Sequence, residues 1–329
     1  ALVARSGPKG ERASLEAAVK YFFAGGLAGA LFLLGMALHY HQTGSLLLIR
    51  AVDAPLARAA VALMGAAALF KVGAFPLHFW LPDVYESAQA DLAGFLSTSM
   101  KAAGVLLLLR IAAILPESPL CRALPWLGAA TALFGAILAL RQNRLQRLLA
   151  YSSISHAGNL VLGVGAWAAQ GALPEAAAPV FFYLTAYLFM SNGIFVFLKS
   201  SGVSEWKDLK GLGARRPWAA AGAAALAFCL AGIPPTGGFF AKFFVWWEAV
   251  KAGLYFPAAV AALASLVALG YYLGMVKEMW LEPSPAAAPP GEEAQEFSPE
   301  RVVVWACAVG AVLLGLAPWI FKGLLGRLL

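Results

Sequence analysis

Three lysines lie within long apolar stretches of the sequence, and their positions define the chemistry that this chain could perform. Lys71 and Lys242 each lie beside a proline-containing segment, whereas Lys101 lies deep in the apolar run that begins at residue 89. A charged side chain at the centre of a bilayer costs at least ~2.5–3.5 kcal/mol, so such a lysine either has a partner or spends time without its proton. We therefore predict a proton path through Lys71, Lys101 and Lys242. The alternative is that they form static ion pairs that lock helices together.

Three weaker candidates accompany these lysines. His156 lies in the polar stretch YSSISHAGN, where its imidazole could pass protons between lysines or only donate an interhelical hydrogen bond. Glu16 and Lys20 have the i, i+4 spacing of a helical ion pair, and a side chain that reaches towards the membrane surface explains Lys20 equally well. We treat all three as possible members of the path.

Two further acidic regions have simpler interpretations. Asp83 and Glu86 follow the first proline-containing segment, and we predict that they cap a loop where the path leaves the membrane. Glu248 lies three residues before Lys251 near the end of an apolar stretch. We predict an interfacial ion pair there rather than a gate.

The other reactive side chains form no recognisable cofactor motif. Cys121, Cys229 and Cys307 are far apart in the sequence, and the four histidines are dispersed. The sequence has no glycine-rich nucleotide loop, haem-attachment motif or zinc-binding HExxH helix. We expect no metal and no cofactor on this chain, so any electron transfer takes place on other proteins.

The composition predicts that transmembrane helices hold these residues. The sequence is 61% hydrophobic and 12% charged, whereas soluble domains are roughly 45–50% apolar. A helical span needs about 20 apolar residues, and the windows that meet this condition number nine: 16–38, 55–82, 89–112, 123–141, 148–168, 178–198, 217–251, 254–276 and 302–321. We therefore predict an all-α, polytopic transmembrane bundle.

The second and seventh windows are too long for one straight crossing, and both contain proline. Pro76 interrupts the second window, and Pro234 and Pro235 interrupt the seventh. Proline removes a helical hydrogen bond and clashes with the preceding turn, so both helices must break. A break at membrane depth requires a hydrated cavity or protein partners, and a pair of broken helices indicates inverted repeats. Elsewhere, the glycine-rich stretch 25–35 predicts close helix packing.

The distribution of positive charge predicts the topology. The net charge is +7, and the side of the membrane that holds residue 1 carries nearly twice as many Lys and Arg residues as the other side. By the positive-inside rule, we predict that residue 1 is cytoplasmic and that the C-terminus lies outside. The excess of Lys and Arg residues therefore reflects the membrane topology and the lysines inside the spans, and we expect no nucleic-acid partner.

Two segments lie outside the spans. The acidic, proline-rich stretch 281–301 predicts a cytoplasmic linker before a final span in 302–329. The chain begins with Ala1 in a polar segment that leads directly into a span, so we expect that an earlier part of the protein is missing.

Four motifs resemble one family. The stretches FKVGAFPLHFWLPDVYESA, LSTSMKAAG, LLAYSSISHAG and LAGIPPTGGFFAKF occur in this order over nearly the whole chain. They resemble the antiporter-like membrane subunits of complex I, NADH-quinone oxidoreductase, which are also similar to subunits of multi-subunit sodium/proton antiporters. The chain looks most like the N-type subunit, because Lys242 stands where the M-type usually has glutamate and the long lateral helix of the L-type is lacking.

The resemblance implies a fourteen-helix protein with two inverted five-helix repeats, of which about nine spans are in this chain. Residues 1–112 would be the C-terminal part of the first repeat and residues 113–280 the second. The first five helices, including one with a glutamate that partners the Lys71 equivalent, have no counterpart here. Lys71, Lys101 and Lys242 correspond to the family's central charged residues, and Glu16 and Lys20 match charged positions.

The resemblance also implies the function. The chain would move protons across the membrane while quinone is reduced in other membrane subunits of complex I, with NADH, FMN, iron–sulfur clusters and quinone all bound to partner subunits. One alternative is a subunit of a sodium/proton antiporter without a redox partner. Another is a structural membrane scaffold whose lysines are static.

Overall fold

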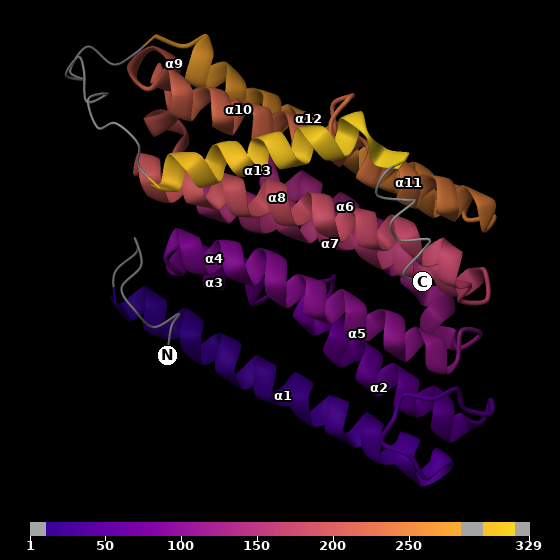
Figure 1. Ribbon diagram of the computed structural model, residues 1–329. Helices are drawn as coiled ribbons and strands as arrows, with labels where there is room; N and C mark the ends of the chain where they lie inside the picture. Colours follow the sequence, from indigo (N-terminus) through magenta and orange to yellow (C-terminus); the bar gives the residue numbers. More distant parts are fainter. Residues whose placement is uncertain (1–10, 284–298, 320–329) are drawn as a thin grey trace.

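Long helices that run roughly along one direction make up the part of the chain that the computed structural model describes, residues 11–283 and 299–319 (Figure 1). No β-strand occurs in these ranges, where residues Arg144 and Glu205 form an isolated backbone bridge. The predicted all-α fold is confirmed. The helices are α1 (Glu11–Thr43), α2 (Pro55–Val72), α3 (Leu81–Ser87), α4 (Ala90–Phe95), η1 (Leu96–Met100), α5 (Lys101–Ile114), α6 (Pro119–Ala139), α7 (Leu145–Ala169), η2 (Pro174–Ala177), α8 (Ala178–Ser201), η3 (Trp206–Leu209), α9 (Leu212–Arg215), α10 (Pro217–Ala231), α11 (Gly237–Lys251), α12 (Tyr255–Trp280) and α13 (Pro299–Leu316).

Seven helical stretches in the described ranges are long and apolar enough to cross a membrane. They correspond to all of the predicted windows except 148–168 and 217–251. The first of these two windows is α7, which carries the polar stretch around His156, and the second is the pair α10 and α11. The chain is therefore a multi-pass membrane bundle.

Both predicted helix breaks are present, and they have the same local design. Gly73 caps the end of α2 and Gly232 caps the end of α10, each with a left-handed backbone (φ 78° and φ 84°) that glycine adopts at little cost. The amide of each glycine donates back to two carbonyls of its helix. A cis proline peptide follows each glycine, at Pro76 and at Pro235, before the second halves α3 and α11 begin. The two interrupted helices are thus built alike at the point where they break.

Close packing against α6 positions α7, the helix that carries the polar stretch around His156. A methyl group added to Gly158 of α7 would lie 2.2 Å from the amide nitrogen of Ala132, and one added to Gly128 of α6 would lie 2.5 Å from the amide of Leu162. Only glycine permits backbones to approach this closely. In the stretch 25–35 the expected close packing occurs at Gly35, which faces Met64, whereas nothing lies within 4 Å of the added methyl at Gly25, Gly26 or Gly29.

Some sequence predictions concern residues outside the described ranges. Most of the 281–301 linker and the last residues of the chain belong to this group. The proposed division into two repeats stays a prediction from the resemblance.

Candidate functional site

Lys101 is held by neutral oxygen atoms inside the bundle. Its side chain is 1% exposed, and its Nζ donates hydrogen bonds to the carbonyl oxygen of Ser153 and, at 2.7 Å, to the Ser153 hydroxyl. The Nζ also lies 5.1 Å from the centre of the Tyr187 ring, whose face attracts a cation. Among the described residues no carboxylate pairs with Lys101, so its surroundings stabilise an ammonium only through dipoles.

A π-helical turn, η1, leads into Lys101 and gathers hydroxyl groups beside it. Ser97 Oγ shares hydrogen bonds with the Tyr187 hydroxyl at 2.6 Å, Ser191 Oγ at 2.8 Å and Ser153 Oγ at 3.3 Å. Isolated π-helical turns are frequent at functional sites, because they reposition the side chains that follow. Sequence reasoning missed this turn, although the hydroxyl-rich LSTSM stretch directly before Lys101 was the available signal.

His156 lies between two tyrosines in the same interior. It is 3% exposed. Its Nδ1 shares a hydrogen bond with the Tyr183 hydroxyl at 2.8 Å, and its Nε2 approaches the Tyr272 hydroxyl at 3.4 Å. The ring of Tyr187 lies 5.0 Å from the imidazole centre. Both ring nitrogens therefore have a hydroxyl group through which a proton could move.

Lys242 reaches back to the break of its own interrupted helix. Its Nζ donates to the carbonyls of Leu230 at 2.9 Å and Ala231 at 2.8 Å, and to Ser265 Oγ at 2.7 Å. The last four carbonyls of a helix lack helical partners and carry partial negative charge. The end of α10 thus supplies the acceptors that a 4% exposed lysine on α11 needs, and the break is what makes these carbonyls accessible.

Polar side chains of α5, η1, α7, α8, α11 and α12 form a central polar row that includes the two lysines. On α7, Ser153 and His156 are one turn apart; on α12, Ser265 and Tyr272 are two turns apart, and Tyr272 also bonds to Ser152. The row is not a continuous hydrogen-bonded chain: a ring contact joins Tyr187 to His156, and no hydrogen bond joins Tyr272 to Ser265. Its members are Ser97, Lys101, Ser152, Ser153, His156, Tyr183, Tyr187, Lys242, Ser265 and Tyr272. Sequence reasoning named the lysines and His156 but missed the tyrosines.

Lys71 departs from the prediction of burial. Its side chain is exposed, and it makes no hydrogen bond or ion pair with the described residues. A methyl group added to Gly104, one turn beyond Lys101, would lie 3.2 Å from the Lys71 Cβ, so the backbones that carry the two lysines pack directly against each other. Lys71 lies on a face of α2 that no described residue covers, and its place in the proton path stays a prediction.

Ionic side chains gather at one end of the bundle, where α1, α3 and α7 meet. The expected Glu16–Lys20 ion pair is confirmed at 2.7 Å, and Lys20 also contacts Asp83 at 3.1 Å. Glu86 was wrongly interpreted as a loop cap. Its side chain is 4% exposed and pairs with Arg147 at 2.6 Å, because the short α3 packs against the first turn of α7. Glu16 and Lys20 thus belong to a cluster that lies apart from the central polar row.

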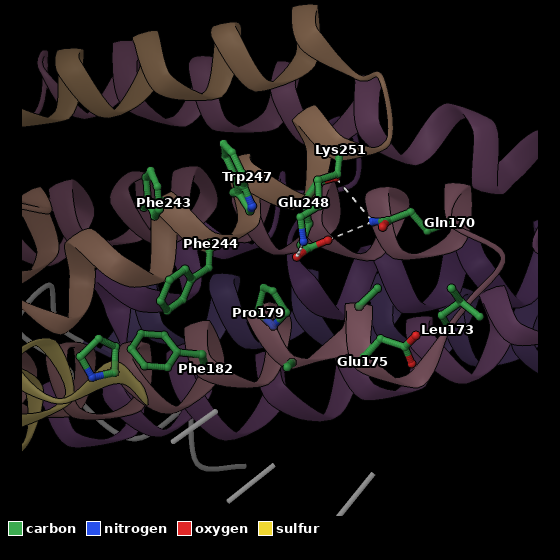
Figure 2. Close-up of a pocket in the computed structure, with 13 residues that line it drawn as sticks. Gln170, Leu173, Glu175, Pro179, Phe182, Phe243, Phe244, Trp247, Glu248 and Lys251 are labelled. Atoms are coloured by element: carbon green, nitrogen blue, oxygen red, sulfur yellow. Dashed lines mark hydrogen bonds and ion pairs between the residues drawn. The ribbon is translucent and has the colours of Figure 1, made fainter. Parts of the chain in front are cut away.

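The predicted interfacial pair at the opposite end is also confirmed. Glu248 Oε1 lies 2.9 Å from Lys251 Nζ, and Gln170 donates to the other Glu248 oxygen at 3.2 Å (Figure 2). Nothing in this geometry makes Glu248 a gate. Within residues 11–283 and 299–319, no three His, Cys, Asp or Glu side chains are placed to hold a metal ion.

Comparison with known proteins identifies relatives that match most of the chain. Residues 5–268 match the family model for NADH:quinone oxidoreductase/Mrp antiporter transmembrane proteins. The chain is 37% identical, over 93% of its length, to NADH-quinone oxidoreductase subunit N 2 of Roseiflexus castenholzii, and 38% identical to subunit N of Desulfovibrio desulfuricans. It spans 65% and 66% of the lengths of these two relatives and 93% of its own length aligns with each.

Solved structures show the same fold. A chain of respiratory complex I from Thermus thermophilus with bound aureothin superposes with a TM-score of 0.83 at 34% identity, over 98% of this chain and 71% of that one. A chain of the Mrp complex from Dietzia sp. DQ12-45-1b gives a TM-score of 0.85 at 23% identity, over 98% of this chain and 68% of that one, which is a likeness of fold alone. The family match and these relatives place the chain in the NADH:quinone oxidoreductase/Mrp antiporter transmembrane family.

Proposed function

We propose that the chain is part of a proton-translocating membrane subunit of NADH-quinone oxidoreductase. The observation that carries the proposal is the central polar row, in which two buried lysines lie at the ends of a series of hydroxyl and imidazole groups. The relatives named subunit N support the assignment to this enzyme rather than to another member of the family. NADH, FMN, iron–sulfur clusters and quinone would bind to partner subunits, where the redox chemistry takes place.

The proposed movement of protons follows from electrostatic repulsion between lysines. A positive charge that arrives at Lys71 lowers the proton affinity of Lys101, since like charges about 10 Å apart repel by about 2 kcal/mol at an effective dielectric near 20. This repulsion is larger than the ~1.4 kcal/mol that corresponds to one pKa unit, so it can lower the proton affinity of Lys101 by more than about tenfold. The proton leaves Lys101 through Ser153 and the neighbouring hydroxyls to His156, and passes through Tyr272 towards Lys242. Water would bridge the places where the side chains are not hydrogen-bonded.

The location of the path in the membrane follows the charge distribution. We place the chain in the cell inner membrane, with the start of α1 and the ionic cluster around Arg147 on the cytoplasmic side. The end of the bundle that carries Gln170 and Lys251 would then face outwards.

A sodium/proton antiporter subunit is the second candidate, because the matched family includes Mrp antiporters. The two functions differ in their partners. A tagged full-length protein isolated in mild detergent should bring with it NADH-driven quinone reduction if the proposal holds. A complex that lacks NADH oxidation would favour the antiporter.

Replacement of Lys242 separates a proton carrier from a structural scaffold. The Lys242→Ala enzyme should assemble and oxidise NADH but pump fewer protons. The substitution removes the amine that donates to the carbonyls of Leu230 and Ala231 and that would carry the proton. Lys277→Ala, which removes an exposed lysine at the end of α12 that pairs with Glu282, is the control and should pump normally. Failure of Lys242→Ala to assemble, with no change in pumping per assembled complex, would support the scaffold.

A further inference from the structure

A cavity of about 410 Å³ lies at the end of the bundle where α7 ends and α8 begins (Figure 2). It is separate from the central polar row and serves no step of the proposed proton path. Its volume is within the range of about 300–1,000 Å³ that is usual for small-molecule sites. The shape and charge of its walls indicate which molecule can occupy it.

The cavity is apolar at one end and polar at the other. Figure 2 shows Phe182, Phe243 and Phe244 grouped at one end, with Gln170, Glu175 and Lys251 towards the other. Along α11, Phe243 and Lys251 are eight positions apart, which corresponds to about 12 Å of helix rise. A ligand that fits this gradient must be amphipathic, with its polar group near the end of the spans.

Two aromatic side chains of the cavity wall are exposed on the outside of the described bundle. Phe243 is 42% exposed and Trp247 is 51% exposed, and both belong to the wall. Tryptophan is enriched where membrane-spanning segments reach the headgroup region. These two exposed aromatic residues would let a membrane lipid enter the cavity along α11.

The charges around the polar end favour a particular headgroup. Among the described residues that line the cavity, Glu175 and Glu248 carry carboxylates and Lys251 carries an ammonium. Lys251 is already paired with Glu248, whereas Glu175 is exposed and makes no ion pair with a described residue. The excess negative charge of these described residues attracts a cationic group and disfavours a lipid whose headgroup is only anionic.

We propose that this cavity binds a phospholipid with a zwitterionic, primary-amine headgroup, that is, a phosphatidylethanolamine. The lipid ammonium lies between Glu175 and Glu248 and donates to their oxygens, and the phosphate lies beside Lys251. The first methylene groups of the acyl chains pack against Phe182, Phe243 and Phe244. A choline headgroup carries the same charge but has no N–H to donate, so it forms only the weaker interaction.

The test measures which lipid stays bound to the purified protein. The complex is stripped of lipid in detergent and supplied in turn with phosphatidylethanolamine, phosphatidylcholine or phosphatidylglycerol, and retained lipid is counted by native mass spectrometry. Wild type should retain the ethanolamine lipid about tenfold better than the choline lipid, the equivalent of ~1.4 kcal/mol. Glu175→Gln should bring this ratio close to one, and Phe243→Ala should lower the retention of all three lipids.

Glu117→Gln is the matched control, because Glu117 is an exposed acid before α6 that pairs with Arg50 and does not line the cavity. It should keep the wild-type preference. Equal retention of all three lipids by wild type would mean non-selective lipid contact and would overturn the proposal, as would a preference for phosphatidylglycerol or an unchanged ratio in Glu175→Gln. The measurement counts retained lipid and does not involve proton pumping. The lipid proposal is therefore tested independently of the function proposed above.

Discussion

Lys101 and Ser153 are joined by two hydrogen bonds across the contact between α5 and α7. The Lys101 Nζ donates to both the backbone carbonyl and the side-chain hydroxyl of Ser153, the latter at 2.7 Å. Neither acceptor carries a formal charge, so the interaction does not offset the desolvation of an ammonium as a carboxylate would. The pair therefore positions the lysine without fixing it in the charged state, as a proton carrier requires.

Lys101→Met should leave the stability of the protein nearly unchanged. Methionine fills a similar volume and removes the desolvation cost of a buried charge, while the Ser153 hydroxyl keeps its other partners, Tyr187 and Ser97. Lys101→Ala leaves a cavity in the same place and should cost about 2–3 kcal/mol. Unfolding of the detergent-solubilised protein measures both values, and a Met variant as unstable as the Ala variant would show that the ammonium itself holds the helices together.

Gly232→Ala should disturb Lys242, whereas Gly253→Ala should not. Both glycines have a left-handed backbone, with φ 84° and φ 74°, so alanine costs about 1 kcal/mol at either position. At Gly232 the new methyl would also lie 3.2 Å from Lys242 Nζ, whereas nothing lies within 4 Å at Gly253. Proton pumping should fall in Gly232→Ala only. Equal pumping in the two variants would remove the helix break from the mechanism.

Glu86→Gln should destabilise the protein more than Glu16→Gln. The Glu86 side chain is buried against Arg147, and the loss of its charge leaves a half-buried guanidinium with Asp83 as its remaining acid, at a cost of about 2 kcal/mol. The Glu16 side chain is 65% exposed and its partner Lys20 keeps Asp83, so its loss should cost less than about 1 kcal/mol. Unfolding of the two variants under identical conditions gives the comparison, and the reverse order would contradict the burial of Glu86.

Asp208 should make the segment 204–216 sensitive to acid. Partial burial raises the pKa of Asp208, but hydrogen bonds from the amides of Glu205 and Ser204 outweigh it and hold the pKa below its ordinary value. A lowered folded-state pKa contributes stability above the unfolded pKa of about 4, and this stability is lost as the pH falls through the folded value.

The Asp208→Asn variant tests this linkage. It should be less stable than wild type by about 1 kcal/mol at pH 7, and the difference should shrink below about pH 4. Thermal unfolding at both pH values measures the difference. A gap that stays constant with pH would show that Asp208 acts through its shape rather than its charge.

The spans and the two breaks were predictable from the sequence because each has a strong local cause. An apolar run of membrane-spanning length forms a helix in lipid, because only a helix satisfies its backbone hydrogen bonds there. Pro76, Pro234 and Pro235 each remove a helical hydrogen bond, so the helices break at these positions. The pairings Glu16–Lys20 and Glu248–Lys251 were predictable for the same reason, because their spacing along one helix brings them together.

The contacts of the central polar row depend on packing between distant helices. Tyr183, Tyr187 and Tyr272 belong to no distinctive pattern in the sequence, and only the arrangement of α7, α8 and α12 turns their hydroxyls towards His156 and Ser153. The burial of Glu86 depends in the same way on Arg147, which is more than sixty residues away in the chain.

The measurement that tests the central claim most directly is the number of protons pumped per NADH oxidised by the assembled complex that carries Lys101→Met. Lys199→Met is the matched control, since Lys199 is an exposed lysine that pairs with Asp91 at the end of the bundle. A proton path through Lys101 predicts a lower ratio in Lys101→Met and an unchanged ratio in Lys199→Met. An assembled Lys101→Met complex that pumps as many protons per NADH as wild type would contradict it.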